Sequence, residues 1–527
     1  MNYLMICTEK LPVPPIRGGA IQTYIDGTTK ILSKERNITI LSVADPDLAT
    51  EEIVDNIHYV RIPGGMFEKY REGVEKFLQA NSFELIHIFN RPRLVLSVRD
   101  AAPTSRLILS MHNDMFTPQK IDQTQASKVI EELDQIITVS DYVGTTIKNS
   151  FPQAASKLNT IYSGVDLDRF MPSTKGSLKQ VRDQLRHEHD LQDKQVILFA
   201  GRLSSNKGVD VLIQALETVY KKHSDIALVI VGSKWFSQDG ITDYIAYVRA
   251  LASRLPFPVV NTGFVSPDKI QNWFAAADMF VCPSQWEEPL ARVHYEAMAA
   301  GLPIVTTARG GNPEVIQPGV NGFVVESPEN PQSFVKPISE LLSEPSNAIK
   351  MGNNGRRLAE ENYHWNRVAN EIKTIWDNVY KERDLQVNED LVHAAEDTFT
   401  EPLVTTKTNN RIENSSHRRR QNNKSKSNQD MLREILLSQF NNDYINNLIT
   451  ILKSDVQNRK VTDINEFVSQ FRQNTEKMMK DQLLNQEQVT NRLMEALNDL
   501  TTVKIFNNDN ERPIKVGRRN KNKAVGR

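Results

Sequence analysis

Residues 278–316, DMFVCPSQWEEPLARVHYEAMAAGLPIVTTARGGNPEVI, contain the pattern that decides the fold. The apolar run Met279–Cys282 and the proline after it predict a buried strand that ends in a loop. Good helix formers over Leu290–Ala300 predict a helix, and Ile304–Thr307 predicts a second strand. The glycine-rich stretch Arg309–Pro313 predicts a loop whose backbone approaches another group closely. Strand, loop, helix, strand and loop make one α/β repeat, so we expect a mainly parallel sheet.

Two carboxylates, Glu288 and Glu296, lie at the edge of this repeat where ligands of open α/β sheets bind. If both residues belong to the helix, eight positions correspond to about 800°, so their side chains point in neighbouring directions at different depths. That arrangement suits one extended ligand. The alternative is that Glu288 caps the helix and Glu296 lies on a solvated face.

The letters around these glutamates carry a family resemblance. E-P-L-A-R-V-H-Y-E-A-M-A-A-G-L-P-I-V, followed by G-G-N-P-E, resembles the donor-site signature of the retaining, GT-B-fold glycosyltransferases of family 4. The resemblance implies that Glu296 holds the nucleotide ribose, and that Glu288 and the backbone of Gly310, Gly311 and Asn312 hold the transferred sugar. The chain departs from the family in having Leu290-Ala291 where Phe-Gly is common.

Two cations before a predicted helix form a second candidate feature. Arg202 and Lys207 follow the predicted strand Val196–Ala200 and precede the predicted helix Val209–Tyr220. Cations at a helix N-terminus can bind a diphosphate, although solvated loop charges are the alternative. The spacing G-R, four residues, K resembles the family pattern, which implies that both cations bind the nucleotide diphosphate.

The first part of the chain has two further candidates. Gly18-Gly19 follows the predicted strand Tyr3–Cys7 and opens a predicted helix, which is either a phosphate cradle or an ordinary tight turn. His112 follows the predicted strand Leu107–Met111 and is either a ligand contact or a structural histidine. The resemblance implies that the glycine pair faces the donor diphosphate and the acceptor, and that His112 lies beside the transferred sugar.

We predict an α/β fold with two facing Rossmann-like domains, the GT-B arrangement that the resemblance implies. The last helix, Trp365–Tyr380, is expected to return to the first domain. The predicted divisions are an acceptor-side domain (1–165), a nucleotide-sugar-binding domain (166–385), a polar, disordered linker (386–430), a helical extension (431–505) and a basic tail (506–527). Further strands are predicted at Ile38–Val43, His58–Ile62, Leu85–Phe89, Gln135–Val139, Leu228–Val231 and Val259–Phe264, and helices at Pro267–Ala277 and Glu340–Arg367.

Composition limits the possible classes of protein. A chain of 527 residues suggests several domains, and a net charge of −1 gives no signal for nucleic-acid binding. The N-terminus lacks a basic leader and no apolar run is long enough to span a bilayer, so we expect a cytoplasmic protein without a transmembrane segment. Cys7 and Cys282 both lie in apolar runs and are predicted to be core residues, not a disulfide.

Two short motifs imitate metal sites. Asp45-Pro46-Asp47 has the form of a metal-binding carboxylate pair but follows a first-domain strand, and His187-Glu188-His189 lies in a charged stretch without further ligands. We therefore predict no metal and no cofactor, with the nucleotide sugar as a substrate.

The C-terminal part differs in charge from the rest. The net charge is +8 from residue 401 on and −9 before it. The basic tail is either a solvated, flexible segment or a contact for an acidic partner. Apolar residues repeat at helical spacing between Leu432 and Leu452, which predicts a helix that packs on its neighbours or on a protein partner.

These features together predict a retaining transfer of sugar from a nucleoside diphosphate sugar, a UDP-sugar by preference, to an acceptor hydroxyl of unknown identity. Glu288, His112, Arg202 and Lys207 are the predicted catalytic residues. The wording of residues 286–301 further resembles family members of the bacterial endospore coat, which suggests a spore-coat or cell-surface role. The alternative is a non-catalytic coat protein built on the same fold.

Overall fold

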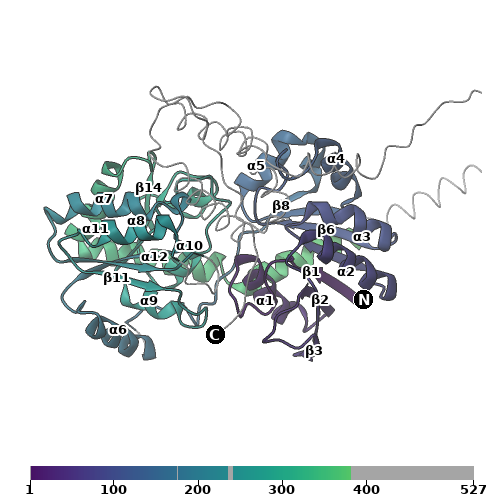
Figure 1. Cartoon of the computed structure of the whole chain (residues 1–527), viewed down its shortest axis with the longest axis horizontal. Coiled ribbons are helices and arrows are strands. Elements are labelled where there is room, and N and C mark those ends of the chain that lie inside the picture. Colours follow the sequence, from purple (N-terminus) through teal and green to yellow (C-terminus); the bar gives the residue numbers. More distant parts are fainter. Residues whose placement is uncertain (1, 175, 235–240, 381–527) are drawn as a thin grey trace, which may run out of the picture. The chain divides into compact units, whose positions relative to one another are not determined.

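The computed structural model describes residues 2–174, 176–234 and 241–380. The predictions for the linker, the helical extension and the basic tail lie outside these residues. Within them the chain forms two α/β sheets with helices on both faces, as the repeat around residues 278–316 predicts (Figure 1).

The first sheet contains strands β1 (Asn2–Ile6), β2 (Asn37–Val43), β3 (Glu51–Val54), β4 (Ile57–Ile62), β5 (Leu85–Phe89), β6 (Arg106–Met111), β7 (Gln135–Thr138) and β8 (Leu158–Thr160). Their order is β3-β4-β2-β1-β5-β6-β7-β8, and β3 pairs with β4 in the antiparallel sense while the other pairs are parallel. The strands predicted in this region are confirmed. The edge strands β3 and β8 were missed. In β3, two glutamates and high exposure hide the strand character.

The side chains of β1 alternate between two hydrophobic cores. Leu4 and Ile6 face helices α2 (Phe67–Ala80), α3 (Val95–Ala101), α4 (Gln123–Glu132) and α5 (Asp141–Ser150). Tyr3 and Met5 face α1 (Ala20–Leu32) and the C-terminal helix over residues 365–380. The period of two along a strand thus places successive residues in opposite layers.

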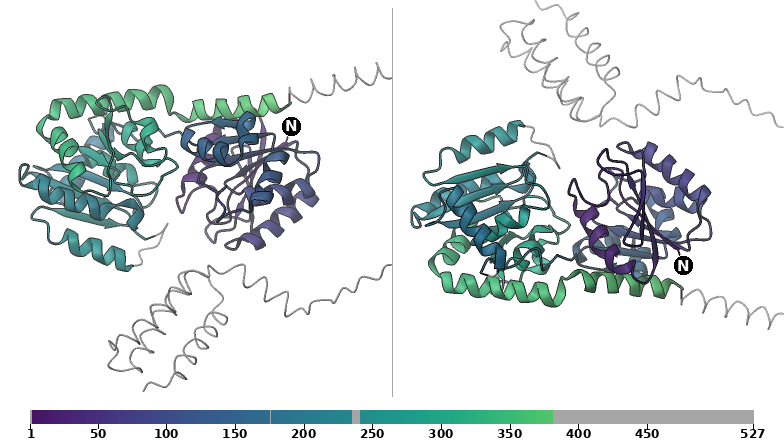
Figure 2. Two further views of the ribbon diagram at one scale, coloured as in Figure 1. Left: turned by 90° about the horizontal axis from the view of Figure 1, so that it is seen from above. Right: turned by 90° about the horizontal axis from the view of Figure 1, so that it is seen from below.

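The helix over residues 365–380 returns to the first domain, as predicted (Figure 2). Its residues Val368, Ile372 and Trp376 are fully buried in the core that contains Tyr3. On its outer side Asp377 accepts a hydrogen bond of 2.8 Å from Arg36. The helix therefore belongs to the first domain's packing although its sequence follows the second domain.

The second sheet contains β9 (Gln195–Ala200), β10 (Ile226–Val231), β11 (Val259–Gly263), β12 (Met279–Val281), β13 (Ile304–Thr307) and β14 (Gly322–Val325), in the order β11-β10-β9-β12-β13-β14. Every pairing is parallel. Its helices are α6 (Gly176–Glu188), α7 (Val209–Tyr220), α8 (Asp243–Ala252), α9 (Ile270–Ala276), α10 (Val293–Ala299), α11 (Gln332–Ser343) and α12 (Pro345–Asn362).

The helical character predicted for Glu340–Arg367 is confirmed, but the stretch is not one helix. The structure divides this stretch into the end of α11, the whole of α12 and the start of the helix over residues 365–380. Pro345 opens α12, because proline lacks the N–H that a continuing helix would need and fits the first helical turn.

Each sheet has one point where the chain reverses its direction of travel. In the first sheet this point lies between β1 and β5, and in the second between β9 and β12. Loops at the carboxyl ends of two such strands diverge and leave room for a ligand. The loops that follow β9 and β12 contain Lys207 and Glu288.

Candidate active site

An ion pair joins the two loops at the reversal point of the second sheet. Lys207 ends the 3-10 turn Ser205–Lys207 after β9, and Glu288 lies in the loop after β12. The Lys207 Nζ atom lies 2.7 Å from both carboxylate oxygens of Glu288. Two residues that the resemblance assigns to different parts of a ligand therefore contact each other directly.

Glu288 is buried and receives four hydrogen bonds. Besides the two from Lys207, Ser284 Oγ donates at 2.7 Å and Trp286 Nε1 donates at 2.6 Å to Oε2. Burial by itself would raise the pKa of Glu288, but the Lys207 ammonium and these donors outweigh it, so the pKa lies below its usual value. Glu288 is therefore a carboxylate, held in one orientation.

The predicted helix over Leu290–Ala300 begins later than expected. The observed α10 starts at Val293, so Glu288 lies in an irregular loop and Glu296 lies in the first helical turn. The predicted relation of about 800° between the two glutamates is wrong, because the residues from Glu288 to Arg292 are not helical. The first residues of the predicted helix, Leu290 and Ala291, belong to this loop, where the Ala291 N–H donates to Asn312 Oδ1 at 3.1 Å.

The glycine pair in the loop Arg309–Pro313 packs against the loop that carries Glu288. A Cβ atom on Gly310 would lie 2.0 Å from the Glu288 carbonyl oxygen, and its φ of +56° also favours glycine. A Cβ atom on Gly311 would lie 2.2 Å from the Pro289 carbonyl oxygen, and the Gly311 N–H donates to the Glu288 carbonyl at 2.8 Å. The close approach predicted for this loop is confirmed, with protein backbone as its partner.

Asn312 presents a buried hydrogen-bond donor beside this loop. Its side chain is fully buried, and its Oδ1 atom accepts from Ala291. That bond orients the amide, and among the described residues its Nδ2 atom has no hydrogen-bond partner. A buried donor without a partner is costly, so such a group points to an acceptor that a ligand supplies.

The other two predicted charged residues, Arg202 and Glu296, lie in the loop after β9 and in α10. Arg202 lies in the loop after β9, where its carbonyl accepts a bond of 3.1 Å from the Ser204 N–H. Glu296 lies 3.4 Å from an Arg292 guanidinium nitrogen. Arg292 was not predicted; it donates to Ser163 Oγ at 3.0 Å and to the Gly164 carbonyl at 3.1 Å, and thereby ties the start of α10 to the segment after β8.

His112 lies at the carboxyl end of β6, as predicted, in an aromatic setting. Its ring contacts those of Tyr24 and Phe89 at centroid distances of 4.8 Å and 5.8 Å. Burial, and then the positive charge of Arg292, lowers the pKa of His112 to about 3, so the ring is neutral. Its Nε2 atom is buried and has no partner among the described residues.

The backbone of His112 is positioned by a residue that the sequence did not reveal. Asn90, buried at the end of β5, accepts with its side-chain oxygen from the N–H groups of His112 and Asn113 at 3.0 Å and 2.9 Å. Asn90 also has a φ of +54°, a conformation that asparagine tolerates better than most residues. A polar residue directly after a strand was its only sequence signal.

Gly18 and Gly19 precede α1 and have φ angles of +81° and +106°. A Cβ atom on Gly19 would lie 2.2 Å from Gln22 Oε1, so the turn requires glycine there. The pair opens the helix whose Tyr24 packs on His112. Whether the pair contacts a ligand stays a prediction.

The two motifs set aside as metal sites have protein partners. Arg17 binds Asp45 through two hydrogen bonds of 3.0 Å and 2.8 Å and also binds Asp47. His187 lies 2.8 Å from Gln192, and the ring of His189 contacts Trp273. Among the described residues no group of three or more metal-binding side chains lies together. Cys7 and Cys282 are buried and unbridged, as expected.

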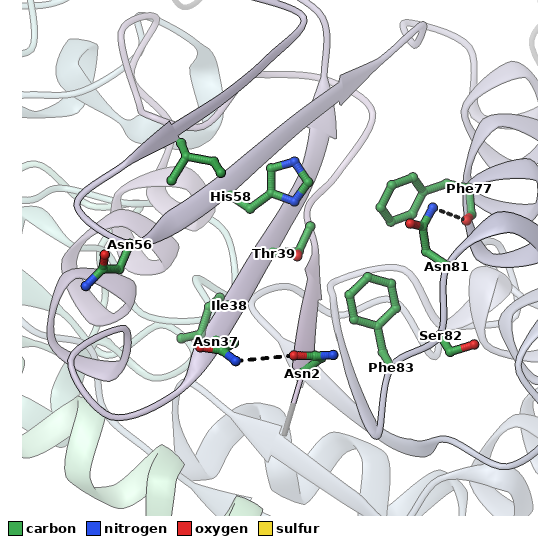
Figure 3. A pocket seen from close by; sticks show the side chains of 11 residues that line it. Asn2, Asn37, Ile38, Thr39, Asn56, His58, Phe77, Asn81, Ser82 and Phe83 are labelled. Carbon is green, nitrogen blue, oxygen red and sulfur yellow. Dashed lines mark hydrogen bonds between the residues drawn. The ribbon is translucent and has the colours of Figure 1, made fainter.

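A cavity of about 330 Å³ lies elsewhere, at the amino ends of strands in the first sheet (Figure 3). Asn2, Asn37 and His58 line it together with Phe77 and Phe83. Ligands of parallel sheets bind at the carboxyl ends of the strands, so this cavity is not the predicted donor site. None of the helices within the described residues is long and apolar enough to cross a bilayer.

Comparison with known proteins identifies the family. Residues 22–169 match the family model "Glycosyltransferase Family 4", and residues 181–358 match the model "Glycosyl transferases group 1". Spore coat protein SA of Bacillus subtilis is 43% identical over 377 residues, which cover 72% of this chain and 99% of that protein. The chain is a family 4 glycosyltransferase. The enzyme class and the GT-B fold implied by the resemblance are thereby confirmed.

A second curated relative and a solved structure are also similar to this glycosyltransferase. The putative glycosyltransferase YtcC of Bacillus subtilis is 43% identical over 388 residues, 73% of this chain and 94% of that protein. Among solved structures, Anabaena Alr3699/HepE in complex with UDP superposes with a TM-score of 0.58 at 21% identity, over 72% of this chain and 99% of that chain. This structural likeness shows the shared fold.

Proposed function

We propose that this glycosyltransferase moves a sugar from a UDP-sugar to an acceptor hydroxyl, with retention of the anomeric configuration. The observation that carries the proposal is the Lys207–Glu288 pair at the reversal point of the second sheet, beside the unpartnered amide of Asn312. A cation, a fixed carboxylate and a buried donor together suit a diphosphate joined to a sugar.

The leaving diphosphate would be stabilised by the cations. Each ammonium has three N–H donors, and the Glu288 carboxylate takes two of those on Lys207. The third is then directed to a phosphate oxygen, together with the Arg202 guanidinium. Charge stabilisation of this kind in a water-poor site is the largest contribution in many enzymes.

The sugar and the nucleoside would be held by the loops around Glu288. In this proposal Glu288 and the backbone of Gly310–Gly311 bind sugar hydroxyls, Asn312 donates its buried amide hydrogen to the donor, and Glu296 accepts from the ribose. His112 would contact the sugar from the first domain. A neutral His112 can accept or donate one hydrogen bond without adding charge.

The choice of UDP rests on the solved structures of HepE with UDP and with UDP-glucose, which share the fold. A competing base is suggested by relatives that are GDP-mannose-dependent, at 29% identity over 274 residues for the one from Mycolicibacterium smegmatis. We further propose that no metal ion is needed, because Arg202 and Lys207 supply the positive charge. Turnover that EDTA abolishes and manganese or magnesium restores would contradict this part.

The biological setting that we propose is the glycosylation of a spore coat or cell surface. The 43% identity to Spore coat protein SA supports it. The same relative also favours a second candidate, a structural coat protein that keeps the fold without turnover. The enzyme is favoured because all four charged residues predicted for the donor site are present: Arg202, Lys207, Glu288 and Glu296.

The decisive experiment is a donor panel. Wild-type enzyme is incubated with UDP-glucose, UDP-galactose, UDP-N-acetylglucosamine and GDP-mannose, with hydrolysis as the readout that needs no acceptor. We expect turnover of at least one UDP-sugar, release of the sugar as its α-anomer by NMR, and loss of turnover in Lys207→Met. Turnover of GDP-mannose alone would show that the donor nucleotide is GDP and not UDP. Binding of a donor without any turnover would favour the structural coat protein.

A further inference from the structure

The carboxylate of Glu314 links the glycine-rich loop Arg309–Pro313 to the first domain. Glu314 lies in the 3-10 turn Asn312–Val315, directly after the glycine pair. Its two carboxylate oxygens accept from the backbone N–H groups of Asp141 at 2.8 Å and of Tyr142 at 2.7 Å. Tyr162 donates a third hydrogen bond from its hydroxyl at 3.0 Å.

These bonds complete the N-terminus of α5. The first N–H groups of a helix have no partner within the helix. The side chain of the cap residue Ser140 accepts from the Val143 N–H, and Glu314 accepts from the N–H groups of the two residues before Val143. A negative charge is favoured at this end of a ten-residue helix, because the aligned peptide dipoles leave it partly positive.

A continuous hydrogen-bond path leads from this helix to Glu288. The Glu314 N–H donates to the Gly311 carbonyl at 3.0 Å, and the Gly311 N–H donates to the Glu288 carbonyl at 2.8 Å. Gly311 also touches the cap itself, since a Cβ atom on it would lie 2.8 Å from Ser140 Cβ. Any shift of α5 is therefore transmitted to the backbone that faces the sugar in the proposed reaction.

We propose that Glu314 is a positioning residue: by binding the N-terminus of α5 it fixes the Gly310–Asn312 backbone and the first domain in one relation for sugar transfer. This inference rests on the proposed function. It predicts an effect on the rate of the chemical step and little effect on nucleotide binding, because Glu314 contacts the sugar-side loop and the first domain, whereas Arg202 and Glu296 hold the nucleotide.

The variants follow from the hydrogen bonds. Glu314→Ala removes all three. Glu314→Gln leaves one acceptor oxygen, but its NH₂ group then faces a backbone N–H, donor against donor. Tyr162→Phe removes the hydroxyl that contacts Glu314 and, at 3.2 Å, Asp141, and leaves both backbone bonds to Glu314. Glu361→Gln, a change at an exposed glutamate of α12, is the matched control.

The kinetic readout separates positioning from simple stability. For hydrolysis of the donor selected by the panel, we expect Glu314→Ala to lower kcat roughly 10- to 100-fold, the scale of a misplaced binding group. The kcat of Glu314→Gln should be close to that of Glu314→Ala, and Tyr162→Phe should lower kcat by less than about threefold. The dissociation constant for UDP should change by less than about threefold in all of them, because binding common to ground and transition state is kept.

A second readout does not depend on turnover. Spin labels at Lys148→Cys in α5 and Glu326→Cys after β14, both exposed positions, report the distance between the two domains. We expect one narrow distribution in the parent and in Glu361→Gln, and a broad one in Glu314→Ala. An unchanged distribution, or a broad one with unchanged kcat, would overturn the inference. If no donor is turned over by the parent, the proposed function fails, and the distance measurement still decides whether Glu314 ties the domains.

Discussion

The reversal points of the two sheets are each crossed by a buried acid–base pair, yet the two pairs differ in what they leave available. In the first sheet, Arg91 after β5 donates hydrogen bonds of 2.5 Å and 2.9 Å to the carboxylate of Glu9 after β1. In the second sheet, Lys207 after β9 donates two hydrogen bonds of 2.7 Å to the carboxylate of Glu288 after β12. The topology is the same and the chemistry is not.

The arginine pair is satisfied by the protein itself. All three guanidinium nitrogens of Arg91 are occupied, two by Glu9 and the third by the Asn90 carbonyl at 2.8 Å. In the lysine pair two of the three ammonium hydrogens bond Glu288, and the ammonium also lies 5.8 Å from the centroid of the Trp286 ring. The first pair is a structural link between loops, whereas the second is the pair to which the proposed function assigns the donor.

The largest expected effect comes from removing each cation. Lys207→Met and Arg91→Met each leave a buried carboxylate without its partner, so each should lower the free energy of unfolding by about 3–5 kcal/mol. Lys207→Met should also lower kcat/KM for donor hydrolysis by at least about 100-fold, the usual cost of one charge-stabilising group. Arg91→Met should leave it within about threefold per folded molecule.

The double variant Lys207→Met/Glu288→Gln sharpens this test. Removing both charges should restore most of the stability, because no unpaired charge remains buried, but not the activity. Denaturant titration and hydrolysis rates measure the two effects separately. Equal activity losses in Lys207→Met and Arg91→Met would remove the distinction between the pairs.

Glu296→Ala should weaken binding of the free nucleotide while the fold stays intact. A charge-assisted hydrogen bond contributes roughly 1.5–3 kcal/mol, or about 10- to 150-fold in affinity. Arg292 keeps its bonds to Ser163 and Gly164 in this variant, so the start of α10 should stay in place. Titration calorimetry with UDP checks the prediction, and an unchanged affinity would reject the ribose role.

His112→Phe should separate function from stability on the first-domain side. The variant removes a buried nitrogen that has no partner among the described residues and keeps an aromatic ring between Tyr24 and Phe89. Stability should therefore stay equal or rise, while hydrolysis falls about 10-fold through loss of one hydrogen bond to the sugar. A less stable protein with full activity would show that His112 is only a core residue.

Acid should destabilise the protein through buried histidines in both domains. Burial lowers the pKa of His87 and His112 to about 3 and that of His294 to about 4. The unfolded chain takes up protons near pH 6.5, so stability is full above that pH and falls as pH drops toward 3–4. The slope is about 1.4 kcal/mol per pH unit for each histidine. Urea midpoints at several pH values should show a shallower slope in His294→Gln, and an identical slope would exclude this histidine as a cause.

The smallest expected effect is that of deleting the C-terminal part. The predicted site residues all precede residue 380, and a match to 72% or 73% of this chain covers 99% and 94% of the two Bacillus subtilis relatives. Truncation after Arg383 should leave turnover unchanged and alter localisation. Lost turnover in a truncated protein that still folds would mean that the deleted residues complete the active site.

Sequence patterns predicted the parts of this fold that local chemistry determines. Apolar runs such as Val196–Ala200 became strands with nearly the same ends, and the glycines at 310 and 311 marked a close backbone approach. The late start of α10 was missed, because the Ala291 N–H is taken by Asn312, a residue more than one strand away. Tertiary hydrogen bonds of that kind leave no periodic signal in the sequence.

Within the candidate site, the sequence pointed to individual residues and missed their partners. Lys207 and Glu288 were both predicted, but not that each binds the other. Asn90 and Arg292 were missed, since their roles depend on loops brought together by the sheets. Glu314 stood within the quoted G-G-N-P-E pattern, yet only its contacts with α5 reveal what it holds.

The proposed function requires that the nucleotide binds at the carboxyl ends of β9 and β12. Hydrogen–deuterium exchange of the full chain with and without UDP tests it most directly. We predict protection of peptides that cover residues 201–208, 286–296 and 309–315. Protection confined to the cavity lined by Asn2, Asn37 and His58, with none in these loops, would contradict the claim (Figure 3).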